Sequence, residues 1–238
     1  MKKIFTLLFL CQIGIVFAQD TIYMDKNYKD LESSSSAQFY KITEKVEGKK
    51  YDFIRRTYWM NGQIKAEQSY YLEADRHVYQ GQHRHWYESG KAFYMADYRK
   101  GTLDGNLVAF WENGQKKRQD RFRNGEFVSG KVWNDKGEEI GYFPHFIRPT
   151  FPGGQEAMAD YLRAHSKVRH QEGKPMVRVV VKFVVDKEGY PSDMEIVEGG
   201  SEAYNREALR LVKTMPKWNP GSSFGEPVRV IYALPIMF

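Results

Sequence analysis

The sequence predicts two folded parts: an all-β repeat module, followed by an α+β domain with two helices on a three-stranded antiparallel sheet. Three observations lead to this prediction. An aromatic motif that ends in glycine recurs between Tyr58 and Gly137. Residues 177–185 place valine or phenylalanine at every second position, which is typical of a strand with one buried face. All nine prolines lie at or beyond Pro144, so the composition changes near that residue.

The first 18 residues have the pattern of a secretory signal peptide. Lys2 and Lys3 precede an apolar run, residues 4–18, that ends in Ala18. A helix of about 15 residues spans roughly 22 Å, less than the roughly 30 Å of a hydrocarbon core, which favours cleavage. We therefore expect a periplasmic protein that begins at Gln19; the alternative is a retained membrane anchor with the rest of the chain facing the periplasm. Cleavage also removes Cys11, the single cysteine.

Residues 51–142 contain the repeat. The segment at residues 58–62 recurs at residues 86–90, 110–114 and, less closely, 132–137, with glycines 28, 24 and 23 residues apart. Each unit predicts an aromatic strand, a type I′ turn at Asn-Gly or Ser-Gly, and a second strand. One hairpin cannot bury its own aromatic side chains, so we expect the units to stack.

The repeated motif resembles MORN-type repeats in their short bacterial form. Residues 19–50 form an N-terminal segment in which residues 39–42 are a candidate first strand of the repeat sheet. Residues 143–152 are a connector that contains Pro144, Pro149 and Pro152.

Residues 153–238 predict the α+β domain. Met158, Tyr161 and Leu162 recur at helical spacing. Residues 186–189 end in glycine and are typical of a hairpin turn. The expected order is a helix at 156–165, strands at 176–185 and 192–198, a helix at 203–215 and a strand at 228–236. Trp218 is expected to fill the corner before the last strand; a ligand platform is the alternative.

Four sequence segments make this domain resemble the C-terminal domain of TonB-type energy transducers. They are FPGG at 151–154, VKFVVDKEG at 181–189, MPKWNPG at 215–221 and PVRVIYALPIMF at 227–238. The resemblance implies a module that grips a peptide of an outer-membrane receptor by adding it as a strand to the edge of the sheet. It departs at residues 167–173, where the family usually carries Tyr-Pro-x-x-Ala. The implied peptide-binding edge consists of Val228, Arg229, Val230, Ile231, Tyr232, Ala233 and Leu234.

No sequence pattern indicates catalysis or a cofactor. The chain has no G-x-S-x-G, P-loop or H-E-x-x-H motif, so we expect no catalytic residues, no cofactor and no metal. His83 and His85 alternate on a predicted strand and could ligate a metal with His77, but plain surface histidines are the preferred interpretation. The net charge of +6 is scattered, which argues against nucleic acid; a solvated basic surface is preferred, with contact to an anionic membrane surface as the alternative.

These observations favour a periplasmic TonB-like binding protein linked to TonB-dependent transmembrane transport. Its expected partner is a peptide of an outer-membrane receptor or another envelope protein. We expect neither a membrane anchor nor a periplasm-spanning spacer, and therefore no force transmission. The apolar residues Val180, Val184, Ile231 and Ala233 on the outer face of the sheet suggest a cover, by a partner, by the repeats or by a second copy in a homodimer. The alternative function is a cell-envelope scaffold that uses the repeats and has no role in transport.

Overall fold

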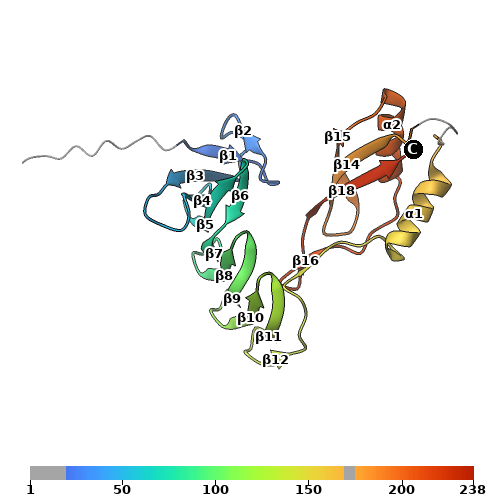
Figure 1. The fold of residues 1–238 in the computed structure, drawn as a ribbon. Helices are drawn as coiled ribbons and strands as arrows, with labels where there is room; N and C mark the ends of the chain where they lie inside the picture. The colour runs from blue at the N-terminus through green and yellow to red at the C-terminus, as the bar shows by residue number, and fades with distance from the viewer. Residues whose placement is uncertain (1–19, 169–174) are drawn as a thin grey trace, which may run out of the picture. The chain divides into compact units, whose positions relative to one another are not determined.

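The structure is a computed structural model that describes residues 20–168 and 175–238 (Figure 1). The predicted signal peptide, residues 1–18, lies outside the described residues. The chain divides into two compact units, Met1–Tyr142 and Phe143–Phe238. We describe each unit by itself, and call them the N-terminal and the C-terminal unit.

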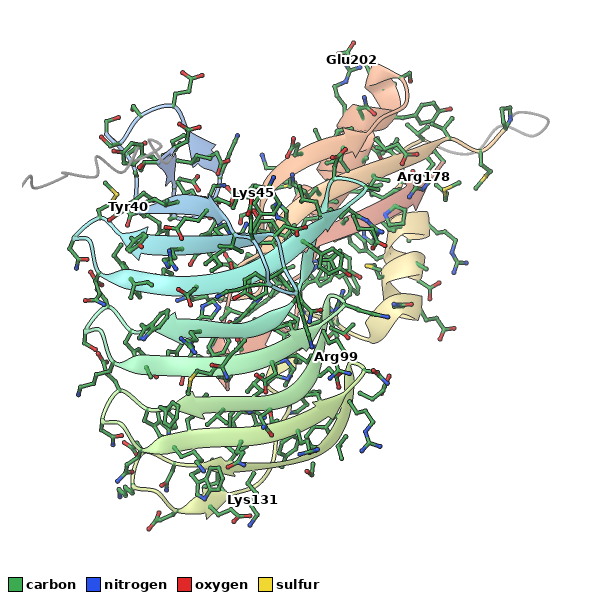
Figure 2. The ribbon with its side chains drawn as sticks, turned by 60° about the vertical axis from the view of Figure 1, so that its left-hand side comes forward. Tyr40, Lys45, Arg99, Lys131, Arg178 and Glu202 are labelled. Carbon is green, nitrogen blue, oxygen red and sulfur yellow. The ribbon has the colours of Figure 1, made fainter. Side chains whose placement is uncertain are left out.

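In the described part of the N-terminal unit, twelve strands form one antiparallel sheet. From β3 onward the strands follow one another as neighbours, and this meander runs in Figure 2 from Tyr40 in β3 to Lys131 in β11. β1 pairs with β3, and β2 pairs with β1. Both β6 and β7 pair with β5. The strands are β1 (Ile22–Met24), β2 (Asp30–Leu31), β3 (Phe39–Lys45), β4 (Phe53–Trp59), β5 (Ile64–Glu73), β6 (Arg76–Tyr79), β7 (Gly81–Trp86), β8 (Ala92–Arg99), β9 (Thr102–Phe110), β10 (Lys116–Arg123), β11 (Glu126–Trp133) and β12 (Glu139–Ile140).

The turns differ from the sequence prediction, which placed type I′ turns in the repeated motif. At the motif, Gly62 has φ 86° but Asn61 is not among the residues of positive φ. Asn61 instead accepts a hydrogen bond from the Gln63 N–H through its side chain, 2.9 Å away, so the loop is a three-residue turn that ends in a glycine bulge. The type I′ geometry occurs in the return turns, where both central residues have positive φ: Lys100–Gly101 and Asn124–Gly125.

Equivalent side chains of the first and third repeats stack in the same way. A register shift in β5 makes Lys65 an extra residue, and its ammonium lies 4.2 Å from the Trp59 ring centroid. Six residues after the equivalent aromatic of a later repeat, Lys117 lies 3.9 Å from the Trp111 ring. The repeats are also joined by hydrogen bonds, since the Trp111 Nε1–H donates to the Trp133 carbonyl at 3.0 Å. Each turn is therefore fixed by its own repeat and by the next one.

One face of this sheet buries polar side chains together with apolar ones. His83 is 1% exposed and its Nε2–H donates to the Ser69 carbonyl at 3.0 Å, so the preferred interpretation of a surface histidine was wrong. Arg118 and Asp120 point to the same side of β10 and form a buried ion pair of 2.8 Å. The histidine is buried because its strand lies inside the sheet, between β5 and β8.

The C-terminal unit combines two helices with two small sheets in its described residues. One sheet has the order β15-β14-β18 and the other β13-β16-β17, all antiparallel. The elements are β13 (Phe146–Ile147), α1 (Gly154–His165), β14 (Arg178–Val185), β15 (Pro191–Glu198), α2 (Glu202–Lys213), β16 (Ser222–Ser223), β17 (Glu226–Pro227) and β18 (Val230–Met237). The two helices and the β14 sheet agree with the predicted α+β fold, whereas the sheet of β13, β16 and β17 had no sequence signal.

The core of this unit follows the alternation of β14. Val179, Val181 and Phe183 are fully buried against both helices and β18. Trp218 is 2% exposed and meets the Phe183 ring edge-on, so it fills the corner and does not form a platform. On the opposite face, for which a cover was predicted, Val180 is buried on the central strand between its two neighbours, whereas Ile231 on the edge strand is 64% exposed.

Candidate functional site

The open edge of β18 is the candidate functional site. β14 pairs with β18 along eight residues, and no other strand of the described residues pairs with β18. Val177 and Phe238 exchange both backbone hydrogen bonds. This pair determines which residues of β18 hydrogen-bond to β14. Because hydrogen-bonded and non-hydrogen-bonded pairs alternate in an antiparallel ladder, residues 230, 232, 234 and 236 bond to β14 and residues 231, 233, 235 and 237 point outward. We call these outward backbone groups the β18 edge.

Pro235 occupies an outward position of this edge. A proline has no N–H, so it is tolerated in a strand only where the N–H would face away from the sheet. The β18 edge therefore offers N–H donors at Ile231, Ala233 and Met237 and a gap between the last two. An incoming strand can pair without interruption at Ile231 and Ala233, and the proline limits further pairing.

The seven residues predicted for the edge fall into three groups. Val228 and Arg229 precede the strand: the Val228 N–H donates to the Gly221 carbonyl at 3.0 Å, and Arg229 pairs with Asp193. A second group faces the core and bonds to β14, namely Val230, Tyr232 and Leu234. The last group is Ile231 and Ala233, whose backbone groups point outward; Ile231 is 64% exposed.

Sequence reasoning missed the continuation of the edge beyond Leu234. Met237 is half-exposed, and its backbone groups point outward like those of Ile231 and Ala233. Counting every second residue onward from Ala233 would have found Pro235 and Met237, because strand side chains and backbone groups repeat with period two.

A groove of about 640 Å³ lies beside the C-terminal half of β18, which we call the α1–β18 groove. Leu162 and Arg163 of α1 form one wall, and Ser166 and Val168 continue it. The opposite wall is the end of β18; the lining there consists of Pro235, Ile236, Met237 and Phe238, with Met176 and Ala159 completing the groove. A chain that pairs with β18 would thus find apolar walls for its side chains.

The groove wall formed by the end of α1 and the residues after it is linked to α2 by charged groups. Glu207 accepts a hydrogen bond from the Lys167 N–H at 2.6 Å, and Arg210 donates to the His165 carbonyl at 2.6 Å. Arg210 also holds Glu207 in an ion pair of 2.8 Å. The hydrogen bond from Arg210, followed by that from the Lys167 N–H, lowers the pKa of Glu207 to about 2. Glu207 therefore stays ionised and positions the chain that follows α1.

Part of the C-terminal unit matches a known sequence family. Residues 167–238 match the family of the Gram-negative bacterial TonB protein C-terminal. The matched part holds β14, β15, α2 and β18, and begins after α1. No curated protein and no solved structure matches the chain. TonB C-terminal domains are non-enzymatic, transport-associated domains of the cell envelope, which agrees in general terms with the predicted partner class and location.

Two further observations concern the described residues as a whole. No helix in residues 20–168 or 175–238 has the length and apolar character needed to cross a membrane. No three His, Cys, Asp or Glu side chains in these ranges are grouped so that they could hold a metal ion, and this includes His77, His83 and His85.

Proposed function

We propose that the TonB C-terminal domain of this protein binds an extended peptide of an outer-membrane receptor or another envelope protein along the β18 edge. The observation that carries the proposal is the outward row of backbone groups at Ile231 and Ala233. In strand addition these groups supply the affinity, and pockets for alternate side chains supply the selectivity. The family match supports the class of partner.

The α1–β18 groove explains how side chains of the peptide would be selected. Alternate residues of an added strand point to the core side of the sheet, where Leu162 and Val168 offer apolar contacts beside β18. Affinity is expected to be modest, on the order of micromolar, because the peptide loses conformational freedom on binding.

A proline substitution in the β18 edge tests this proposal. Ala233→Pro removes an outward N–H and leaves every ladder bond to β14 in place, as Pro235 already does two residues further on. We expect peptide affinity to fall by about tenfold or more, since one paired donor is lost and neighbouring pairing is disturbed. Ala233→Ser keeps the N–H and serves as the matched control.

Hydrogen exchange on the full chain, with and without receptor-derived peptides, locates the contact. Protection should rise at Ile231 and Ala233, whose amides are unpaired in the free protein, and change little in α2. Tight binding with unchanged exchange at these two amides would rule out strand addition. Equal affinities of the Pro and Ser variants would do the same.

For the N-terminal unit we propose a MORN-type repeat sheet that acts as an interaction module of the envelope. The support is the repeated stacking of Lys65 on Trp59 and of Lys117 on Trp111, together with the bonds between successive repeats. Binding of envelope components by residues 20–142 without a contribution from the β18 edge would favour the scaffold function over the transport-linked one. The Ala233→Pro variant separates the two, because only the transport-linked function needs that edge.

A further inference from the structure

The N-terminal sheet carries a concave pocket of about 300 Å³ over its first repeat. The pocket lies on the face that buries His83, above strands β1, β3, β4, β5 and β7. We call it the Lys65 pocket; it is lined by Met24, Tyr28, Lys41, Arg55, Thr57, Lys65, Ala66, Gln68 and His85. Three of these side chains are cationic and none is a carboxylate, although acidic residues are frequent elsewhere in the chain.

The three cations of the pocket differ in their ion pairs. Lys41 forms an ion pair of 2.7 Å with Asp30. Among the described residues no carboxylate forms an ion pair with Arg55 or Lys65. Arg55 donates to the Gln68 side chain at 2.8 Å, a neutral acceptor that leaves its charge uncompensated.

Lys65 is held in place by the fold rather than by an opposite charge. The register shift in β5 turns it over the sheet face, where its ammonium lies 4.2 Å from the Trp59 ring centroid and 5.0 Å from that of Phe39. Burial lowers the pKa of Lys65, while the charge of Glu88 opposes that shift. An ammonium that is partly removed from water and forms no ion pair gains from contact with an anionic ligand.

His85 supplies a third recognition group. Its ring stacks on Tyr94 with centroids 4.1 Å apart, and its Nε2 atom is buried with no hydrogen-bond partner in the described residues. Burial lowers the pKa of His85 to about 3, so the imidazole is neutral at pH 7 and can donate a hydrogen bond from one ring nitrogen. Buried polar atoms are normally paired, and an unpaired one in a pocket indicates a missing partner.

We propose that the Lys65 pocket binds a small anionic group, a carboxylate or a phosphate, with Lys65 and Arg55 as its charged ligands and His85 as a hydrogen-bond donor. Two uncompensated positive charges suit a mono- or dianion, and charge-assisted hydrogen bonds of this kind are among the strongest in proteins. Met24 and Tyr28 add an apolar wall, which suits an anion that belongs to an organic molecule. This site belongs to the N-terminal unit and is independent of the β18 edge.

Calorimetric titration of the full chain with inorganic phosphate, and separately with succinate, tests the proposal. At least one probe should bind with a dissociation constant of about a few millimolar or lower at low ionic strength. Binding of phosphate alone or of succinate alone identifies which anion the pocket prefers. Lys65→Met and Arg55→Gln should each weaken binding about tenfold through the loss of one charge-assisted contact.

Two control variants keep the test specific. Lys45→Met removes the same charge from an exposed lysine of β3, labelled in Figure 2, that does not line the pocket; its affinity should stay within about twofold of wild type. Lys65→Arg keeps the cation over Trp59 and should retain binding, which separates the loss of charge from a change of side chain at this position. The ring C–H signals of His85 should shift on titration. A dissociation constant above about 5 mM for both probes, or an equal loss of affinity in Lys45→Met and Lys65→Met, overturns the proposal.

Discussion

The C-terminal unit buries almost only apolar side chains, whereas the N-terminal unit buries His83, Arg118 and Asp120 among its apolar ones. In the described part of the C-terminal unit the buried charged residue is Glu207, at the edge of the core. The difference follows from architecture. A helix-covered sheet excludes water from a whole face, while a single meander must cover its buried face with its own long side chains. The two units should therefore respond differently to cavities, acid and turn chemistry.

The largest effect is expected from a cavity in the apolar core. Phe183 is fully buried and contacts Trp218 and Tyr232, so Phe183→Ala should destabilise the C-terminal unit by about 3–5 kcal/mol. The N-terminal unit has separate buried residues and should keep its stability. Segment-resolved hydrogen exchange measures both. Equal loss of protection in the two units would show that they unfold together and that the comparison does not hold.

Mild acid should affect the N-terminal unit first. Burial lowers the pKa of His83 to about 4 from the ordinary 6.5, with Arg55 acting in the same direction and the Ser69 carbonyl against it. A lowered folded-state pKa means that the unfolded chain takes up the proton more readily. The stability that neutral His83 contributes is thus complete above pH 6.5 and lost as the pH falls toward 4, by roughly 3 kcal/mol in total.

Urea unfolding at several pH values, followed by amide signals of each unit, checks this. His83→Gln keeps a donor for the Ser69 carbonyl and should reduce the pH dependence in that window, where His85, with its pKa lowered to about 3, supplies the remainder. His165→Gln replaces an exposed histidine of the C-terminal unit and should leave the profile of the N-terminal unit unchanged. An unchanged slope in His83→Gln contradicts the assignment.

Stronger acid should then affect the C-terminal unit. The pKa of Glu207 is lowered to about 2 from the ordinary 4.5, chiefly by the hydrogen bond from Arg210. Its stabilising contribution is present above pH 4.5 and lost as the pH falls toward 2. Glu207→Gln should remove this acid sensitivity. It should also weaken the peptide affinity of the β18 edge, because Glu207 holds Lys167 beside the α1–β18 groove.

Hydrogen exchange at the Lys167 amide gives an independent measure of this link. The amide donates to Glu207 and should exchange faster in Glu207→Gln, since a neutral acceptor binds it less strongly. Unchanged exchange there, together with unchanged acid sensitivity, would mean that Glu207 does not hold the groove.

The C-terminal fold could be predicted largely from sequence because its signals are local. The period of two in β14 and the turn at Asp186, whose side chain accepts from the Glu188 N–H at 3.0 Å, both follow from neighbouring residues. The family resemblance predicted that β18 lies at an edge of the sheet. It did not predict which residues of β18 hydrogen-bond to β14 and which point outward. This alternation depends on the backbone hydrogen bonds between Val177 and Phe238, which link the residue before β14 to the end of the chain.

The N-terminal unit resisted prediction where contacts cross from repeat to repeat. His83 reads as exposed in its own strand, and only the pairing of β7 with neighbouring strands buries it. The Lys65 pocket likewise joins residues of five strands, and the bulge that turns Lys65 over Trp59 arises from the pairing of β5 with β4. Local periodicity cannot report a site whose members become neighbours only when the sheet forms.

The smallest effect tests the turn geometry of the repeat sheet. Lys100 and Asn124 occupy the same position of two return turns, with φ 48° and 50°, and each is followed by glycine. Asparagine tolerates this left-handed region better than lysine, so Lys100→Asn should stabilise the N-terminal unit by about 0.5 kcal/mol. Asn124→Lys should destabilise it by a similar amount. Both backbone N–H groups already bond to side chains, at Gln80 and Asp104, so neither change alters those bonds. Thermal unfolding of the two variants and of the double exchange measures the effect; shifts of equal sign in the two single variants would mean that side-chain contacts, and not backbone preference, decide these turns.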